Sequence, residues 1–218
     1  MYDAVRRLRD SYNFNPKSVL DIGANQGSWT AAMKKELPQA TFTLIEGNRN
    51  WLEHLEAQQL GDVHIAIVGD RRKRVTYFSK PSAHSGNSIY LERTSEFKNN
   101  NEVVKEIRNM QTVDDLLSKK TYDLVKIDVQ GAELDVLKGA KRIVQQAEVL
   151  HLELSTTEYN AGAPLAMEVM QAVHQLGFRF YEVVEMHYSS GVLIQIDVLF
   201  IHKESLLWAK IEHAANLV

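Results

Sequence analysis

Acidic and imidazole side chains gather at the ends of two apolar runs in the middle of the sequence. The first run, from residue 122, alternates so that Lys126 and Asp128 lie on one face of an expected strand. The second run sets His151 and Glu153 against leucines in the same way. If the two runs are neighbouring parallel strands, these side chains meet at one edge of the sheet, where a carboxylate or an imidazole can take a proton from a hydroxyl group.

The predicted candidates for this general base are Asp128 and Glu153, with His151 and His84 as alternatives. A charge buried without a partner is strongly unfavourable, so Lys126 must pair with neighbouring carboxylates or face the cleft. The structural alternative is an ion-pair network inside the sheet that ties the lysine and the histidine to the two carboxylates. Such a network and catalysis can coexist.

A glycine-containing turn follows the apolar run nearest the N-terminus, in the segment Ser-Val-Leu-Asp-Ile-Gly-Ala-Asn-Gln-Gly at residues 18–27. Gly23 and Gly27 suit backbone that approaches a ligand closely or takes a positive φ, and Asp21 supplies an acceptor at the end of the strand. The next apolar run along the chain ends in Glu46, which is placed to accept hydrogen bonds from two ribose hydroxyls. The spacing Asp-x-Gly-x-x-x-Gly suits S-adenosylmethionine, a methyl donor that carries no phosphate.

A dinucleotide site is the competing interpretation, because an acid about 20 residues beyond a glycine turn also marks a Rossmann domain. A Gly-x-Gly-x-x-Gly loop that starts at Gly23 requires glycine at two positions where this sequence has Asn25 and Ser28. The close approach of a pyrophosphate is therefore not provided. A nicotinamide-dependent oxidoreductase stays open as an alternative, and so does a non-catalytic binding module on the same fold.

The composition indicates a globular protein. Its 218 residues suffice for one α/β domain, and 44% hydrophobic with 24% charged residues exclude a disordered or fibrous chain. We therefore expect a single domain over residues 1–218. The sequence has no cysteine, which excludes disulfides and thiolate metal sites and fits a reducing cytoplasm. No histidine and carboxylate cluster has metal-ligand spacing, so no metal is predicted, although carboxylates beside a diol could hold magnesium.

Nucleic acid is not expected as a partner, and a small-molecule or glycan acceptor is expected instead. The formal net charge of −3 gives no overall attraction to nucleic acid, and the basic run at 71–74 is predicted to be a solvated turn, with a polyanion site as the alternative. The amphipathic helical segment 1–15 lacks the apolar centre of a signal peptide, and no membrane segment is expected. A homo-oligomer stays open.

Strand-like and helix-like stretches alternate along most of the sequence, which is typical of βαβ units and a parallel sheet. Two further strands near the C-terminus are joined too closely for a crossover helix, so they predict an antiparallel hairpin. The expected fold is α/β and Rossmann-like, a mainly parallel seven-stranded sheet with helices on both faces, as in class I methyltransferases. The expected strands are 19–22, 42–46, 63–68, 123–128, 149–154, 178–184 and 194–202, and the expected helices are 29–37, 51–59, 133–146 and 167–176.

Two segments fall outside this alternation. Residues 78–101 are polar, with no clear strand or long helix, and they follow the third strand. A loop of that length is predicted to cover the cleft as a substrate lid with His84 and Asn87 near its tip, and an insertion without a role is the alternative. The amphipathic tail 205–218 is predicted to pack on the domain.

With these residues in view, the chain resembles the FkbM family of S-adenosylmethionine-dependent methyltransferases over roughly residues 17–203. The segments that carry the resemblance are 19–27, 112–116 and 125–140. The resemblance implies a class I fold and O-methylation of a sugar or a secondary metabolite. The cofactor contacts that it implies are Asp21, Gly23, Ala24, Asn25, Gly27, Glu46 and Asp128, with Asp70 reaching the adenine amino group.

The chain departs from the family pattern at two places. The family usually has Glu-Gly where this sequence has Gln130-Gly131, which removes a carboxylate from the predicted catalytic edge. The family often has Glu-x-x-Pro where this sequence continues from Glu46 through Gly47 and Asn48 to Arg49. The ribose acid is retained there, but the start of the following helix is altered.

Overall fold

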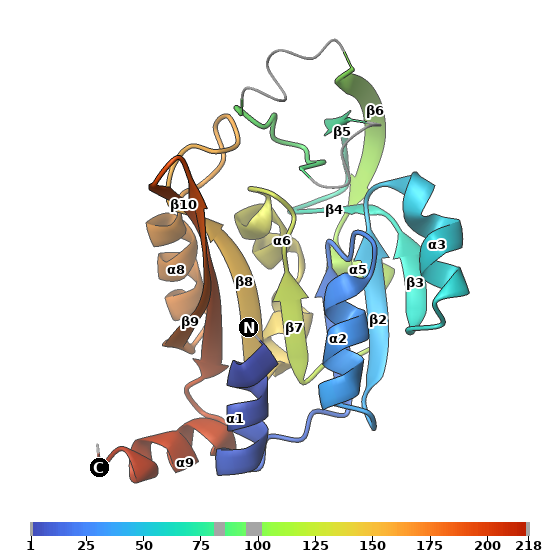
Figure 1. The fold of residues 1–218 in the computed structure, drawn as a ribbon. Helices are drawn as coiled ribbons and strands as arrows, with labels where there is room; N and C mark the ends of the chain where they lie inside the picture. The colour runs from blue at the N-terminus through green and yellow to red at the C-terminus, as the bar shows by residue number, and fades with distance from the viewer. Residues whose placement is uncertain (1, 81–85, 95–101, 217–218) are drawn as a thin grey trace.

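A seven-stranded sheet forms the centre of the molecule, and helices cover both of its faces (Figure 1). The structure, a computed structural model, describes residues 2–80, 86–94 and 102–216. The strand order is β3-β2-β1-β7-β8-β10-β9, and only β10 runs antiparallel to its neighbours. The predicted fold is confirmed. The strands are β1 Ser18–Ile22, β2 Thr41–Glu46, β3 Asp62–Ile65, β7 Leu124–Ile127, β8 Val149–Ser155, β9 Phe178–Ser189 and β10 Val192–His202.

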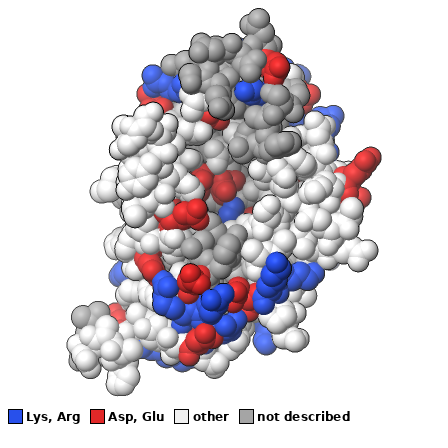
Figure 2. Space-filling view, in the orientation of Figure 1, with Lys and Arg blue, Asp and Glu red and all other residues white. Residues whose placement is uncertain are grey.

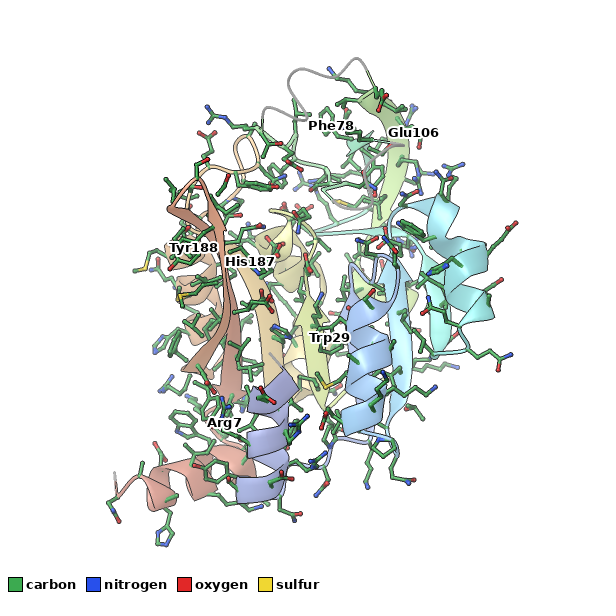
Figure 3. All side chains as sticks on the ribbon, in the orientation of Figure 1. Arg7, Trp29, Phe78, Glu106, His187 and Tyr188 are labelled. Atoms are coloured by element: carbon green, nitrogen blue, oxygen red, sulfur yellow. The ribbon has the colours of Figure 1, made fainter. Side chains whose placement is uncertain are left out.

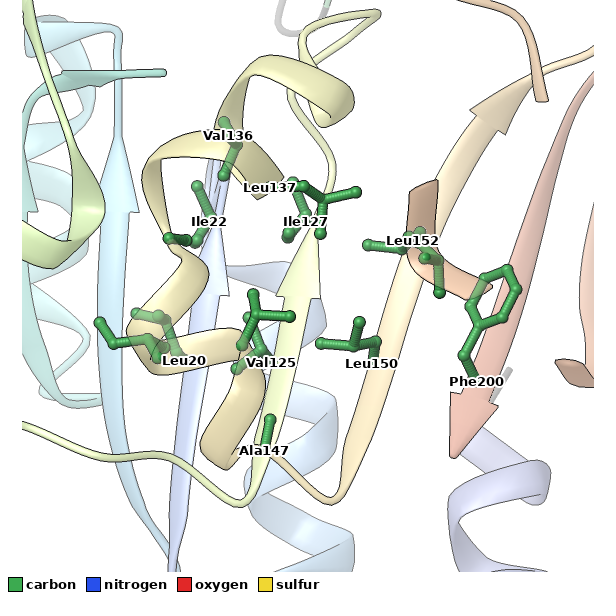
Figure 4. Close-up of a cluster of buried hydrophobic side chains, with 14 of the residues drawn as sticks. Leu20, Ile22, Val125, Ile127, Val136, Leu137, Ala147, Leu150, Leu152 and Phe200 are labelled. Carbon is green, nitrogen blue, oxygen red and sulfur yellow. The ribbon is translucent and has the colours of Figure 1, made fainter. Parts of the chain in front are cut away.

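Two hydrophobic clusters hold the helices against the sheet. On one face, aliphatic side chains of β1, β7 and β8 contact Val136 and Leu137 of α6 (Figure 4). On the other face, Met33 of α2 and Leu8 of α1 are fully buried. Covering both faces explains why the strands read as apolar runs. The helices are α1 Tyr2–Tyr12, α2 Ser28–Glu36, η1 Arg49–Trp51, α3 Leu52–Ala57, α5 Val113–Leu116, α6 Glu133–Gly139, α7 Lys141–Gln146, α8 Ala166–Gln175 and α9 Leu206–Ala214.

A second, three-stranded sheet stands beside the carboxyl ends of the main strands, and the sequence did not predict it. It consists of β4 Ile67–Val68, β5 Lys73–Ser79 and β6 Val104–Gln111, in the order β4-β6-β5. The predicted strand 63–68 is therefore wrong as one element, because the chain leaves the main sheet at Ala66 and Ile67 pairs with Met110. The basic run 71–74 is a turn only at its start, since Lys73 and Arg74 open β5.

Three other predicted boundaries also differ. The expected helix 133–146 is two helices, α6 and α7, which separate at Ala140. A Cβ atom on Gly139 would lie 1.9 Å from the carbonyl oxygen of Gly69, so the break coincides with a close backbone contact. The C-terminal hairpin is longer than predicted, because only Ser190 and Gly191, both with positive φ, form its turn. The expected helix 51–59 begins as a 3-10 turn.

The C-terminal helix α9 packs on the domain through buried Leu207 and Ile211. The ammonium group of Lys210 donates to the carbonyl oxygen of Tyr12, which joins α9 to the end of α1. In the described part of the chain, we find no helix whose length and hydropathy would allow it to cross a bilayer.

Candidate active site

A cavity of about 300 Å³ opens at the carboxyl ends of the central strands. The strands that follow β1 in the chain lie on one side of it, beginning with β2, and the later strands lie on the other side, beginning with β7. The strand order therefore reverses at β1, and open α/β folds bind ligands at such a topological switch point. Figure 2 shows acidic side chains in a hollow in the middle of the molecular surface that faces the viewer. The polar residues that line the cavity are Asn25, Glu46, Tyr77, Asn87, Ser88, Asp128, Gln130, Glu153, Tyr159 and Gln195.

The turn after β1 is as tight as its glycines predict. Gly23 has φ +84°, and a Cβ atom at this position would lie 1.7 Å from the carbonyl oxygen of Asp128. Gly27 has φ +79° where α2 begins, and Asn25 between them also has a positive φ of 49°. Backbone N–H groups of Gly23 and Ala24 donate to the carbonyl oxygen of Ile45, which fixes the turn against β2. Only glycine fits at position 23.

Glu46 ends β2 inside the cavity and is held by the backbone. Its Oε2 accepts from the N–H of Asn25 at 2.7 Å and its Oε1 from the N–H of Asn48 at 2.6 Å. Burial raises the pKa of Glu46 despite these two hydrogen bonds. The Oδ1 atom of Asn25 is buried without a hydrogen-bond partner among the described residues. The cavity thus offers a carboxylate and an unmatched acceptor to a ligand that carries hydroxyl or ammonium donors.

Asp21 lies below the cavity and is not among the residues that line it. Its side chain is fully buried, and Oδ2 accepts from the hydroxyl of Thr30 at 2.6 Å. Its Oδ1 lies 3.7 Å from the Nζ of Lys126. Burial raises the pKa of Asp21, although the lysine opposes this shift. The structure therefore places Asp21 as a partner of the buried lysine beneath the turn.

Asp128 and Glu153 lie together, as the alternation of their strands predicts. The Nζ of Lys126 lies 3.0 Å from Oδ2 of Asp128. The side-chain amide of Gln130 donates to Oδ1 of Asp128 at 2.9 Å and to Oε2 of Glu153 at 2.5 Å. The amide of Gln195, from β10, donates to the same Oε2 at 2.8 Å. Gln130 has a positive φ of 54°, so the chain adopts the left-handed conformation where this amide joins the two carboxyl groups.

The pKa values of the two carboxyl groups shift in opposite directions. Burial opposes ionisation of Asp128, but the Lys126 ammonium and the Gln130 amide outweigh it and lower the pKa of Asp128. Burial, followed by the negative charge of Asp128, raises the pKa of Glu153 well above its usual value. Opposite shifts in adjacent titratable groups are typical of catalytic sites. Asp128 is the stronger acid of the pair.

The buried lysine is paired, as the structural alternative predicted. Burial disfavours the charge on Lys126, but Asp128 and Asp21 together raise the pKa of its ammonium group above the usual value. Trp29 points from α2 toward the sheet (Figure 3), and its ring centroid lies 5.6 Å from Nζ. His151 is not part of this ion-pair group.

His151 instead bonds to a residue that the sequence analysis missed. Its Nε2 lies 3.0 Å from Oδ1 of Asp197, and Nε2 of His187 lies 2.7 Å from Oδ2 of the same carboxylate. Figure 3 shows His187 on β9, in the upper part of the hairpin that β9 forms with β10. Asp197 is opposite Glu153 in the pairing of β10 with β8. Gln195 and Asp197 alternate with apolar residues in β10. This pattern was the signal in the sequence that could have revealed these two residues.

The donor atoms of Glu153, His187 and Asp197 lie within 4.8 Å of one another, a spacing that could hold a metal ion. Both oxygens of Asp197 already accept from imidazoles, and Oε2 of Glu153 accepts from two amides. These contacts are those of a hydrogen-bonded network, so we do not assign the three residues as metal ligands.

The described part of the predicted lid lies over the cavity. Asn87 lines the cavity and accepts from the N–H of Lys80 at 3.1 Å. The hydroxyl of Ser88 donates to the carbonyl oxygen of Val129 at 3.1 Å. His84 falls outside the described residues, so its predicted role as a base is not addressed by the structure.

Besides Asp21, three predicted cofactor contacts lie away from the cavity lining. Ala24 and Gly27 form the turn through their backbone. Asp70 lies 2.8 Å from the Nζ of Lys73 in an ion pair. The structure therefore brings Gly23, Asn25, Glu46, Asp128 and Glu153 together around one cavity.

The strand order, the single antiparallel strand β10 and the switch-point cavity define the class I methyltransferase fold. The model of the FkbM methyltransferase domain matches residues 21–180, which is more than half of the chain. The chain therefore belongs to the FkbM methyltransferase family. This membership gives no support to the dinucleotide alternative.

Known proteins are similar to this chain in sequence or in fold. Methyltransferase 1 of Beauveria bassiana (strain ARSEF 2860) is 26% identical over 161 residues, which are 63% of this chain and 61% of that protein. The crystal structure of methyltransferase FkbM from Methylobacillus flagellatus KT aligns with a TM-score of 0.56 at 16% identity, over 84% of this chain and 43% of that chain. The N-terminal domain of EvdMO1 with SAH bound aligns with a TM-score of 0.53 at 13% identity, over 92% and 80%. The chain spans less than two thirds of the length of the first two relatives.

Proposed function

We propose that this protein transfers a methyl group from S-adenosylmethionine to a hydroxyl group of a sugar, a glycan or a secondary metabolite. The observation that carries the proposal is the pair of acid sites in one switch-point cavity, with Glu46 on β2 and Asp128 with Glu153 on β7 and β8. Two strands separate β2 from β8, so the two acid sites are about 14 Å apart across the sheet. Membership of the FkbM family supports methyl transfer as the reaction.

The residues around Glu46 fit the nucleoside part of the cofactor. Its carboxylate would accept from the ribose hydroxyls, and the orphaned Oδ1 of Asn25 would accept from a further donor group. Gly23 allows close approach to the turn. The bound cofactor supplies an electrophilic methyl group on a sulfonium. The chain itself has to hold the acceptor oxygen in line with that carbon and remove its proton.

We assign Asp128 as the general base. The Lys126 ammonium lowers its pKa, it lines the cavity, and a positioned base contributes roughly 10²- to 10⁴-fold to such a reaction. Glu153 is the neighbouring acid, joined to Asp128 through the amide of Gln130, and with its raised pKa it would hold a proton of its own beside the base. His151 is 1% exposed and bonds to Asp197, which suits a positioning role better than contact with the acceptor.

The lining of the cavity supports a hydroxylated acceptor. Side-chain amides of Gln130 and Gln195 and the hydroxyl of Ser88 stand at its acid-rich side. Such groups match hydroxyl donors and acceptors better than an apolar ring does. The segment 78–101, whose described part covers the cavity, would act as the lid that excludes water.

Calorimetric titration with S-adenosylmethionine, S-adenosylhomocysteine and NAD tests the cofactor. We expect binding of the first two and none of NAD, and binding of NAD alone would overturn the proposal. Screening hydroxylated acceptors with labelled methyl donor then tests turnover. Binding without turnover on any acceptor would favour the non-catalytic binding module.

A further inference from the structure

Both amide donors at Glu153 bond to the same oxygen. Nε2 of Gln130 and Nε2 of Gln195 lie 2.5 and 2.8 Å from Oε2. An amide N–H only donates, so Oε2 is the acceptor of both bonds. The amide of Gln130 also donates to Oδ1 of Asp128 at 2.9 Å, so one amide group joins the two carboxyl groups. Two adjacent carboxyl groups served by a single shared ammonium group are in the arrangement that favours one proton between them.

Among the residues that the structure describes, the surroundings leave no cation for a second negative charge. Lys126 is the one ammonium group that the structure places in this described cluster, and it is already shared between Asp128 and Asp21 at 3.0 and 3.7 Å. A negative charge on Glu153 would therefore be added to a group of acids without compensation. The other titratable groups around the pair are Asp197 on β10, Glu133 on α6, His151 on β8 and His187 on β9.

We propose that Asp128 and Glu153 sense the charge of the bound cofactor, releasing their shared proton to solvent when the sulfonium form binds and keeping it when the thioether product binds. This inference rests on the proposed function, because it requires the cofactor to occupy the cavity that both residues line. An arriving positive charge favours the doubly ionised pair, and a neutral thioether does not.

The reaction balances on this basis. The acceptor O–H bond breaks as the O–CH₃ bond forms, the S–CH₃ bond breaks, and its electron pair stays on sulfur. The acceptor proton goes to the carboxylate pair. The positive charge of the sulfonium and one negative charge of the pair disappear together, so the net charge in the cavity is the same before and after transfer. The pair is thereby free of its shared proton only when a methyl donor is present.

Gln130 has a specific part in this arrangement, although it does not titrate. Its amide joins the two carboxyl groups, and its position is where the family usually has glutamate. A glutamate there would add a third acid and remove the donor that fixes Oε2. We assign Gln130 as a positioning residue for the proton pair.

Proton release on binding can be measured without the acceptor. S-adenosylmethionine and S-adenosylhomocysteine are titrated calorimetrically into the native protein at pH 7 in phosphate and in Tris, whose different ionisation enthalpies give the number of protons exchanged. We expect the sulfonium form to release up to about one proton more than the thioether. Sinefungin, which carries an ammonium group in place of the sulfonium, should behave like the sulfonium form.

Two variants separate the pair from other proton sources, including the amino group of the ligand. Glu153→Gln keeps the shape but removes the shared proton, and we expect the difference between the two ligands to fall to that of the ligands themselves. Glu204→Gln, whose carboxylate is 76% exposed, should keep the native difference. Equal proton numbers for all ligands in the native protein would overturn the inference while the cofactor assignment stands. An undiminished difference in Glu153→Gln would overturn it too, and binding of neither ligand would overturn the proposed function with it.

Discussion

The ammonium group of Lys126 lies 3.0 Å from a carboxylate oxygen of Asp128, inside a sheet where the lysine side chain is 5% exposed. This contact lowers the pKa of Asp128 and favours it over Glu153 as the proposed base. Lys126 and Asp128 form a largely buried ion pair. Removing one partner costs far more stability than the intact pair contributes, because the other charge is then left without its partner.

Replacing Lys126 with methionine should destabilise the protein by about 3–5 kcal/mol, because the fully buried Asp21 and the partly buried Asp128 would both lose their cation. Urea unfolding followed by circular dichroism measures the change. Lys138→Met, on the exposed side of α6, is the matched control and should change stability by less than about 0.5 kcal/mol. Equal effects of the two variants would contradict the pairing.

Gly23→Ala should destabilise the fold by about 4 kcal/mol or more, since the new Cβ atom would meet the carbonyl oxygen of Asp128 at 1.7 Å. Gly162→Ala is the control for backbone strain alone. Gly162 has a similar φ of +73° with nothing within 4 Å of the added atom, so about 1 kcal/mol is expected. Thermal unfolding compares the two, and a similar loss in both would argue against the steric explanation.

Glu46→Gln should weaken binding of S-adenosylhomocysteine roughly tenfold to a hundredfold, the loss expected for hydrogen bonds to a charged group. The amide would also direct a donor at one of the two backbone N–H groups that Glu46 now accepts from. Calorimetry gives the dissociation constant, and Glu56→Gln on the exposed side of α3 serves as the control. Unchanged affinity in Glu46→Gln would remove Glu46 from the ribose site.

Glu133 should make stability depend on pH. Burial raises the pKa of Glu133 from 4.5 to about 7, while its Oε1 accepts from the N–H groups of Val129 and Gly131. The unfolded chain releases this proton at lower pH than the folded protein, so the stabilisation present below pH 4.5 is lost as the pH rises toward 7. The loss corresponds to roughly 3 kcal/mol.

Urea unfolding of the native protein and of Glu133→Gln between pH 4.5 and 7.5 measures this contribution. The amide variant cannot ionise, so its stability should fall less over the same interval. Parallel pH curves for the two proteins would exclude Glu133 as the titrating group. Other buried acids contribute equally to both curves and cancel in the comparison.

Much of the fold could be predicted because the central strands are buried on both faces and therefore read as apolar runs. Gly23 and Gly27 were predictable by residue type, because glycine accepts the positive φ of such a turn, although the atoms that exclude a side chain belong to other elements, Asp128 at Gly23 and Leu55 at Gly27. The alternation along β7 and β8 placed Asp128 and Glu153 on one face of adjacent strands, where register brings them together. The residue types and their alternation are therefore visible in the local sequence.

The small sheet and the His151–Asp197–His187 network depended on tertiary structure. Strand β6 is largely exposed and rich in charged residues, so its pairing with β5 leaves little hydrophobic pattern in the sequence. His151 meets Asp197 only because β10 inserts beside β8 in antiparallel register, 46 residues further along the chain.

The sequence by itself determined the glycine turn, the apolar strands and the acids at their ends, because local sterics and burial dictate those residue types. Tertiary structure decided how the pKa values of the two acids differ. The pKa of a carboxyl group depends on the charges and donors around it. The cation of Asp128 is its strand neighbour Lys126, but the amides on Glu153 come from Gln130 and Gln195, 23 and 42 residues away along the chain.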